Sequence, residues 1–253
     1  MSKEKLLPVN MLWVGESVGL NEQLSMLSFL ACGHPVLLHV YDTVTNAPNG
    51  VRLVDATRTV EFERIQSLRE RKTGSFALAS DYFRYMLQAR NAGLWADMDM
   101  VCLKPVRKRK QTIMGFERPD SINCAILQLD KDLPIVGELL GIFRDGYIPP
   151  WVDPKVARKR RLKRWLPNRR IRPAIMPWGT YGPQALTSLA RKHALIDQAE
   201  PKPVFYPLDQ FRAHEMFDPG VALESIVCEE TQTIHLWNET LRQLDLKNTR
   251  PHP

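Results

Sequence analysis

Two aspartates one residue apart, Asp97 and Asp99, have the side chains best suited to chemistry in this sequence. They follow a short apolar run, and an extended backbone would send both carboxylates to one face while Met98 points into the core. Carboxylate oxygens suit a hard cation such as magnesium or manganese, which takes its other ligands from water and substrate phosphates. The pair therefore predicts a site for a divalent cation.

The residues before the pair predict the elements that would position it. Apolar side chains between residues 75 and 91 fall in one helical sector at about 100° per residue, with Asp81 and Arg84 on the opposite side. Asn91-Ala92-Gly93 then supplies a helix stop, because glycine tolerates the left-handed backbone found there. We expect a helix that leads into a short strand ending at the aspartates.

A strand, a helix and a second strand open the chain. Residues 10–15 form a first strand ending in glycine, and Asn21 can cap a helix that stops at Gly33. Residues 36–41 form a continuous apolar run, which is typical of a buried strand. This order is the opening of a parallel α/β sheet. Further along, we expect strands at 112–116 and 122–129 and a helix at 184–193.

The block around the aspartates resembles the signature of the DxD sugar transferases of glycosyltransferase family 32. This family includes initiating mannosyltransferases, α-1,4-galactosyltransferases and bacterial capsule or lipooligosaccharide transferases. The resemblance implies a single domain over 1–253 with a GT-A-type α/β fold, a Rossmann-like mixed sheet flanked by helices. It is carried, in this order, by Ala79-Ser80-Asp81, Arg84, Ala92-Gly93, Trp95 and Asp97-Met98-Asp99, with Ala92 in place of a glycine and Trp95 in place of a tyrosine.

The resemblance also implies a reaction. Asp99 would bind the cation directly, and Asp97 would bind the ribose, or the cation through water. Asp81 and Arg84 would position the donor sugar or its phosphate. The cation would stabilise the charge that grows on a departing diphosphate. We therefore expect a retaining hexosyltransferase that moves a sugar from a nucleotide-sugar, with UDP-sugars the common donors among relatives, to a cell-surface glycan or glycolipid.

Five residues elsewhere complete the expected site, on the strength of the resemblance. It places Trp13 and Gly15 at the nucleotide and Asn123 in the sugar pocket. In a strand, His235 and Trp237 would share a face. The resemblance implies that His235 lies near the cation or a phosphate and that Trp237 donates a hydrogen bond to a phosphate or the glycosidic oxygen. A core tryptophan, a loop asparagine and a structural histidine remain the alternatives.

The segment between Lys155 and Arg172 has ten basic residues and no acidic one, which is more than the whole net charge of +7. Leu162 and Trp165 are interleaved with this charge, a combination suited to an anionic membrane surface, where each basic residue contributes about 1 kcal/mol. We expect a basic insertion at about 153–173 that contacts such a surface. Nucleic acid is not expected, because no nucleic-acid-binding motif accompanies the charge. A solvated loop without a partner is the alternative.

Composition places bounds on these interpretations. The 253 residues, 44% hydrophobic and 25% charged, are typical of a globular domain. No run approaches the roughly 20 apolar residues that span a bilayer. After Lys3 and Lys5, the apolar stretch that a signal peptide needs is interrupted by Pro8, Asn10 and Glu16. We therefore expect a cytoplasmic protein, peripheral on the inner face of the cell membrane.

Two other function classes remain open. Residues 97–101 also fit the nucleophile motif of haloacid-dehalogenase-type phosphatases, in which the first aspartate is phosphorylated. That class needs a long apolar strand before the motif and a late acidic pair, and Glu229-Glu230 lacks the context of such a pair. The non-enzymatic alternative is a basic membrane- or nucleic-acid-binding protein with structural aspartates. It explains the basic segment and leaves the order of the other motifs unexplained.

Overall fold

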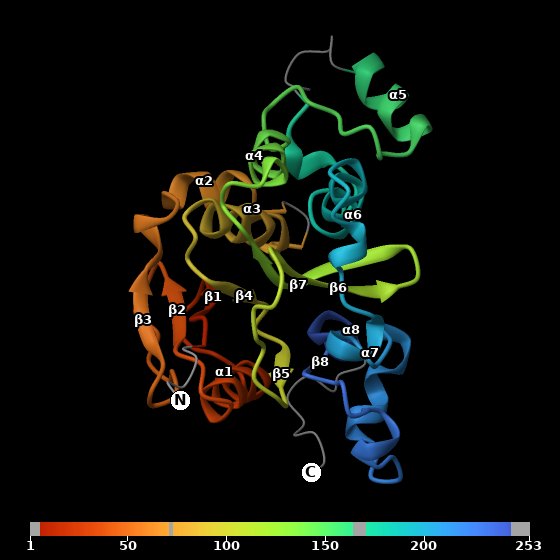
Figure 1. Ribbon diagram of the computed structural model, residues 1–253. Helices are drawn as coiled ribbons and strands as arrows, with labels where there is room; N and C mark the ends of the chain where they lie inside the picture. Colours follow the sequence, from red (N-terminus) through yellow and green to blue (C-terminus); the bar gives the residue numbers. More distant parts are fainter. Residues whose placement is uncertain (1–5, 71–72, 164–170, 244–253) are drawn as a thin grey trace.

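The computed structural model describes residues 6–70, 73–163 and 171–243. Its centre is a six-stranded mixed sheet in the order β3-β2-β1-β4-β7-β6, with helices on both faces (Figure 1). This arrangement confirms the predicted α/β class and the mixed sheet flanked by helices. The strands are β1 (Val9–Trp13), β2 (Val36–Val40), β3 (Arg52–Asp55), β4 (Leu94–Ala96), β6 (Thr112–Arg118) and β7 (Ser121–Leu129), and a separate pair, β5 (Met100–Cys102) with β8 (Thr233–His235).

The four strands β3, β2, β1 and β4 run parallel, while β7 is antiparallel to both β4 and β6. From β1 the chain adds β2 and then β3 on one side, and it returns to add β4 on the other side. The strand order therefore reverses between β1 and β4. The continuous apolar run of 36–41 is explained by helices covering both faces of this sheet.

Two hydrophobic clusters join the helices to the sheet. On one face the cluster includes residues of α2 (Phe62–Ser67), α3 (Ala77–Ala89), α4 (Pro134–Gly141) and α6 (Pro183–Lys192). On the other face it includes residues of α1 (Leu20–Ala31) and α7 (Lys202–Phe205). The other α-helices are α5 (Pro154–Lys163) and α8 (Asn238–Gln243), and residues 164–170 of the predicted basic insertion lie outside the described residues. Within the described ranges, every helix is too short or too polar to cross a bilayer.

Helix α3 ends at Ala89, just before the predicted stop 91–93, and Asn91 of that stop is left-handed (φ 52°). The N–H of Ala92 donates to the carbonyl of Leu87 at 3.1 Å, which is the bond of a Schellman cap. Gly93 is also left-handed (φ 112°), and a Cβ there would lie 2.6 Å from the carbonyl oxygen of Pro8. Glycine at this position therefore lets β4 start directly beside the beginning of β1.

The structure corrects one local prediction and shows a burial that the pattern did not predict. Asn21 does not cap α1, because the N-cap is Gly19 and Asn21 is buried, with its Nδ2 donating to Oδ1 of Asn238 at 3.0 Å. In α3, the side opposite the apolar stripe is buried as well, including Arg84 and Tyr85. Strand β7 and the segment before α6 contact this side through hydrogen bonds. Helix α3 is thus a central element whose polar face looks into the protein.

Candidate functional site

The predicted site lies at the carboxyl ends of β1 and β4. These strands are parallel neighbours, with Asn10 opposite Trp95. The segments that follow Trp13 and Ala96 therefore leave the sheet at the same edge. This is also the point at which the strand order reverses. In open α/β sheets, ligands bind in the crevice outside the carboxyl ends of the strands at such a point. Chain topology therefore brings Gly15 and Asp97 to the edge of the sheet at which ligands bind in folds of this kind.

Asp97 and Asp99 lie in a turn and not in an extended strand. Strand β4 ends at Ala96, and the N–H of Met100 donates to the carbonyl oxygen of Asp97 at 3.1 Å. The predicted alternation along a strand is therefore wrong as the cause of their placement. Each carboxylate is instead fixed by its own partners, Asp97 by Arg84 of α3, and Asp99 by His235 of β8 and the N–H of Asn238.

Arg84 lies buried between two carboxylates. Its Nη2 atom is 3.3 Å from Oδ1 of Asp81 and 3.1 Å from Oδ1 of Asp97. Its Nη1 donates to the carbonyl of Cys124 at 2.6 Å, and the guanidinium sits 4.9 Å from the ring centre of Trp95. The indole N–H of Trp95 donates to the same Asp97 oxygen at 2.7 Å. Two carboxylates thus share one guanidinium, and the cluster keeps negative charge when both are ionised.

Exposure separates the members of this cluster. The side chain of Arg84 is 5% exposed, that of Asp81 is 14% exposed and that of Asp97 is 27% exposed. Arg84 therefore lies behind the carboxylates and fixes them, and its direct contact with a donor sugar stays a prediction. Asp97 offers the largest accessible surface to a ligand.

The carboxyl group of Asp81 has a raised pKa. Burial and the neighbouring Asp97 raise the pKa of Asp81 to about 6, although Arg84 opposes them. A Cβ on Gly182 would lie 2.9 Å from Oδ1 of Asp81, so glycine allows the start of α6 to approach the carboxylate. A carboxyl group with this pKa can hold or release a proton near neutral pH.

The imidazole of His235 lies against the carboxylate of Asp99. The Nε2 atom of His235 is 3.2 Å from Oδ1 of Asp99, and the N–H of Asn238 donates to Oδ2 at 2.9 Å. Burial alone would raise the pKa of Asp99, yet His235 and that N–H hold it below its usual range. Burial alone would lower the pKa of His235, yet Asp99 holds it above its usual range. The buried Nδ1 of His235 has no hydrogen-bond partner among the described residues.

Trp237 stacks on His235, with ring centres 3.9 Å apart and ring planes inclined by 31°. The two rings are thus neighbours, as predicted. Their placement does not come from alternation along a strand, because β8 ends at His235 and Trp237 is left-handed (φ 57°). Such backbone strain costs about 1–3 kcal/mol and gathers at functional sites. The indole N–H of Trp237 donates to the carbonyl of Leu208 at 3.0 Å. A hydrogen bond to a phosphate would have to replace this bond.

Trp13, Gly15 and Asn123 differ in how open they are to a ligand. Trp13 is partly buried and packs against the core, and its indole N–H has no hydrogen-bond partner among the described residues. A Cβ on Gly15 would lie 3.2 Å from that nitrogen, so the glycine keeps the edge of the indole uncrowded. Asn123 is buried, donates to Glu117 at 2.7 Å and accepts from the N–H of Ala125 at 2.8 Å. Its place in a sugar pocket stays a prediction.

Sequence reasoning missed several polar residues around the site. Asn238 donates to Oε1 of Glu22 at 2.8 Å and accepts from Asn21, so it ties α1 to α8 beside Asp99. Glu117 is a buried carboxylate on β6. Asn238 directly follows the predicted His-x-Trp motif, which is a signal that could have found it. Glu117 lies in an apolar strand pattern with no such signal.

The donor set fits a hard divalent cation. Asp97 and Asp99 offer carboxylate oxygens, with side chains 27% and 16% exposed, and His235 offers a ring nitrogen. In the ranges that the structure describes, no three His, Cys, Asp or Glu side chains are grouped closely enough to hold a metal ion alone. Magnesium is usually held by one or two carboxylates, with water and substrate phosphates completing its shell. Two carboxylates at the edge where the strand order reverses match that mode.

The chemistry available at this edge therefore combines carboxylates for a cation, a protonatable carboxyl group and a histidine held by Asp99, whose second ring nitrogen has no partner among the described residues. The sequence matches no family model and no curated protein. Function is therefore inferred from the geometry of the site and from the motif resemblance.

Proposed function

We propose that the protein is a metal-dependent, retaining glycosyltransferase of GT-A type that moves a sugar from a nucleotide-sugar, a UDP-sugar by preference, to a glycan or glycolipid. One observation carries the proposal. The Asp97-x-Asp99 turn lies where the strand order reverses between β1 and β4, at the same sheet edge as Gly15. Nucleotides bind at this position in doubly wound sheets, and a diphosphate needs a counter-cation of the kind that carboxylates hold.

Asp97 and Asp99 are the residues that hold the cation. When bound, a divalent cation supplies positive charge to the departing diphosphate. Hydrogen bonds from Arg84 and Trp95 fix Asp97 before any ligand arrives, so little reorganisation is needed on binding. His235 is oriented by Asp99 through Nε2. Its Nδ1 binds the cation when the ring is neutral and donates to a phosphate oxygen when the ring is protonated.

Asp81 and Trp13 take the remaining roles. Asp81 lies across Arg84 from Asp97 and accepts hydrogen bonds from hydroxyls of the donor sugar. Trp13 borders the nucleotide base, and its buried indole N–H has no hydrogen-bond partner among the residues that the structure describes. Retention of configuration follows from the family resemblance alone, and no residue is assigned as a covalent nucleophile.

Release of nucleoside diphosphate from UDP-sugars and GDP-sugars with manganese tests this function. We expect release that requires the metal, is lost in Asp97→Asn and Asp99→Asn, and is kept in the control Asp132→Asn, whose side chain is 88% exposed. Asp132 follows β7, which is antiparallel to β4, and so lies toward the opposite edge of the sheet. Unchanged release in the two site variants would exclude the proposed role of the aspartates.

A further inference from the structure

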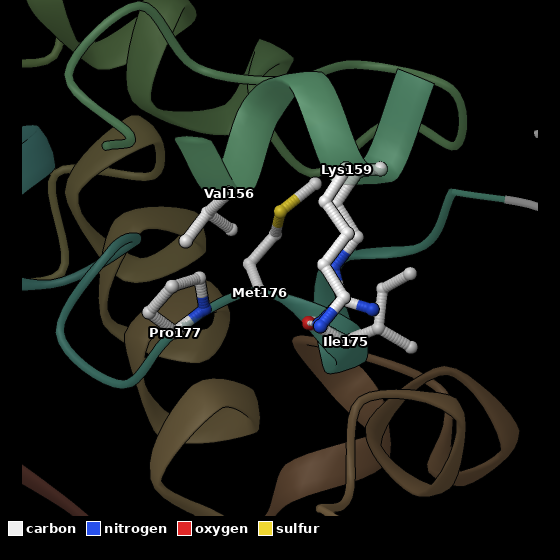
Figure 2. Close-up of a pocket in the computed structure, with 6 residues that line it drawn as sticks. Val156, Lys159, Ile175, Met176 and Pro177 are labelled. Atoms are coloured by element: carbon white, nitrogen blue, oxygen red, sulfur yellow. Dashed lines mark hydrogen bonds between the residues drawn. The ribbon is translucent and has the colours of Figure 1, made fainter. Parts of the chain in front are cut away.

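A second feature lies apart from the candidate site, in a pocket between α5 and the segment 175–177. Figure 2 shows Val156 and Lys159 on the helix facing Ile175, Met176 and Pro177 on that segment. The pocket has a volume of about 320 Å³. Its lining combines four apolar residues with two basic ones: Val156, Ile175, Met176 and Pro177 with Lys159 and Arg160.

Arg160 connects the two walls of this pocket. One of its terminal nitrogens donates to the carbonyl oxygen of Ile175. Its Nε is buried and has no hydrogen-bond partner among the described residues. A buried donor without a partner is unfavourable, and an anionic oxygen in the pocket would satisfy it. The lining therefore fits a group that joins a phosphate to hydrocarbon.

The surroundings of the pocket are basic and carry exposed apolar side chains. Helix α5 has no acidic residue, and Lys155, Arg158 and Arg161 are exposed on it. Leu162, two residues after Arg160, is 68% exposed, and Trp178, directly after Pro177, is 77% exposed. Basic residues beside exposed leucine and tryptophan are typical of contact with an anionic bilayer, and tryptophan is enriched at membrane interfaces.

Chain continuity connects this surface to the candidate active site. Pro177 and Gly182 are five residues apart, so their Cα atoms are separated by at most about 18 Å. Gly182 in turn lies against the carboxylate of Asp81. Contact of the pocket with a bilayer would therefore hold the candidate site close to the membrane surface.

We propose that this pocket binds the phosphate headgroup of an anionic phospholipid, with Leu162 and Trp178 inserted beside it, and so docks the protein on an anionic bilayer. The proposal goes beyond glycosyl transfer and does not rest on it. An anionic bilayer would attract the basic residues and also bury the exposed leucine, whereas a nucleic-acid backbone would interact with the basic residues alone.

Vesicle flotation without nucleotide or metal tests the docking. We expect binding to vesicles of phosphatidylcholine mixed with phosphatidylglycerol and none to phosphatidylcholine alone. Loss of one basic residue that interacts only with the average surface charge weakens partitioning of the protein onto the vesicles about fivefold. Arg158→Gln, on the same helix outside the pocket, is the matched control, and its binding to the mixed vesicles should weaken by that factor. Arg160→Gln loses clearly more, because it also removes the headgroup contact.

The exposed apolar side chains have a matched control as well. Trp178→Ala weakens binding to the mixed vesicles. Phe211→Ala leaves it unchanged, although Phe211 is 78% exposed. Phe211 belongs to the 3-10 helix Gln210–Phe217, in the blue part of the chain at the opposite end of the molecule from α5 (Figure 1).

Three results would overturn the proposal. Equal losses in Arg160→Gln and Arg158→Gln would exclude the pocket, and absence of binding by folded wild type to mixed vesicles would exclude the docking. Binding of an RNA oligonucleotide under conditions where vesicles are not bound would assign the surface to nucleic acid. Because Arg160→Gln also loses the bond to Ile175, Met176→Glu is the second variant, and its new carboxylate is expected to abolish vesicle binding.

Discussion

The Nη2 atom of Arg84 lies 3.1 Å from Oδ1 of Asp97, and this contact joins the middle of α3 to the turn after β4. The same guanidinium also contacts Asp81 at 3.3 Å. The helix that leads the chain into β4 therefore also fixes the first aspartate of the pair. A buried guanidinium with several hydrogen bonds holds the carboxylates in place before a ligand binds.

Replacing Arg84 with lysine keeps the charge and removes the planar set of donors. We expect Arg84→Lys to lower the free energy of unfolding by about 1–3 kcal/mol, because buried acceptors lose their partners. Binding of a nucleotide with manganese should also weaken by about tenfold or more, since Asp97 keeps only its hydrogen bond from Trp95. Denaturant unfolding and calorimetry measure the two effects. Arg242→Lys, at a side chain 60% exposed, should stay within about 0.5 kcal/mol of wild type, and similar losses in both variants would contradict the buried role.

Two glycines give opposite expectations for the same substitution. Gly93→Ala should destabilise the fold by about 3 kcal/mol or more, because a left-handed backbone costs about 1–3 kcal/mol and the new Cβ would lie 2.6 Å from the Pro8 carbonyl. Gly137→Ala, in α4 with open space around its would-be Cβ, should stabilise by about 0.5–1 kcal/mol. Thermal and denaturant unfolding compare them. Equal effects would show that the close approach of β4 to β1 is not required.

Asp81 predicts a pH-dependent stability. Its pKa of about 6 in the folded protein lies above the ordinary value of 3.8, so the folded state holds this proton more tightly than the unfolded state. The stabilisation that this proton gives to the folded state is fully present below about pH 3.8 and is lost as the pH rises through about 6. The Asp81→Asn side chain does not ionise. Relative to wild type, the free energy of unfolding of this variant should therefore rise by about 3 kcal/mol over this range.

Denaturant unfolding across that pH range measures the gain of Asp81→Asn, with Asp132→Asn as the control. The variant should be more stable than wild type at neutral pH and yet weaker in turnover, as expected where a functional carboxylate is kept at a cost in stability. A constant difference between the two variants at every pH would contradict the raised pKa.

The sequence pattern predicted the framework of the fold well. The parallel opening, the helix before β4 and the strands β6 and β7 all follow from local periodicity and turn residues, which act within one element. The aspartate pair was also placed correctly at the end of a strand. The turn that holds it was not, because alternation describes a strand and Asp97 already lies beyond β4.

The contacts that complete the site depend on tertiary pairing and could not be predicted from local patterns. His235 meets Asp99 because β5 pairs with β8, with Met100 opposite His235, and no residue pattern near either strand encodes that register. The sequence pattern placed Arg84 opposite the apolar stripe of its helix. Its burial follows from β7 and the segment before α6 covering a polar face, which periodicity assigns to solvent.

The central claim is that the Asp97-x-Asp99 turn binds a nucleoside diphosphate through a divalent cation. Calorimetric titration with UDP and with GDP, each with manganese and with chelator, tests it most directly. We predict that one nucleotide binds only with manganese, that Asp99→Asn abolishes this binding, and that Asp132→Asn binds as wild type does. Binding unaffected by chelator, or no binding of either nucleotide at millimolar concentration to the folded protein, would contradict the claim.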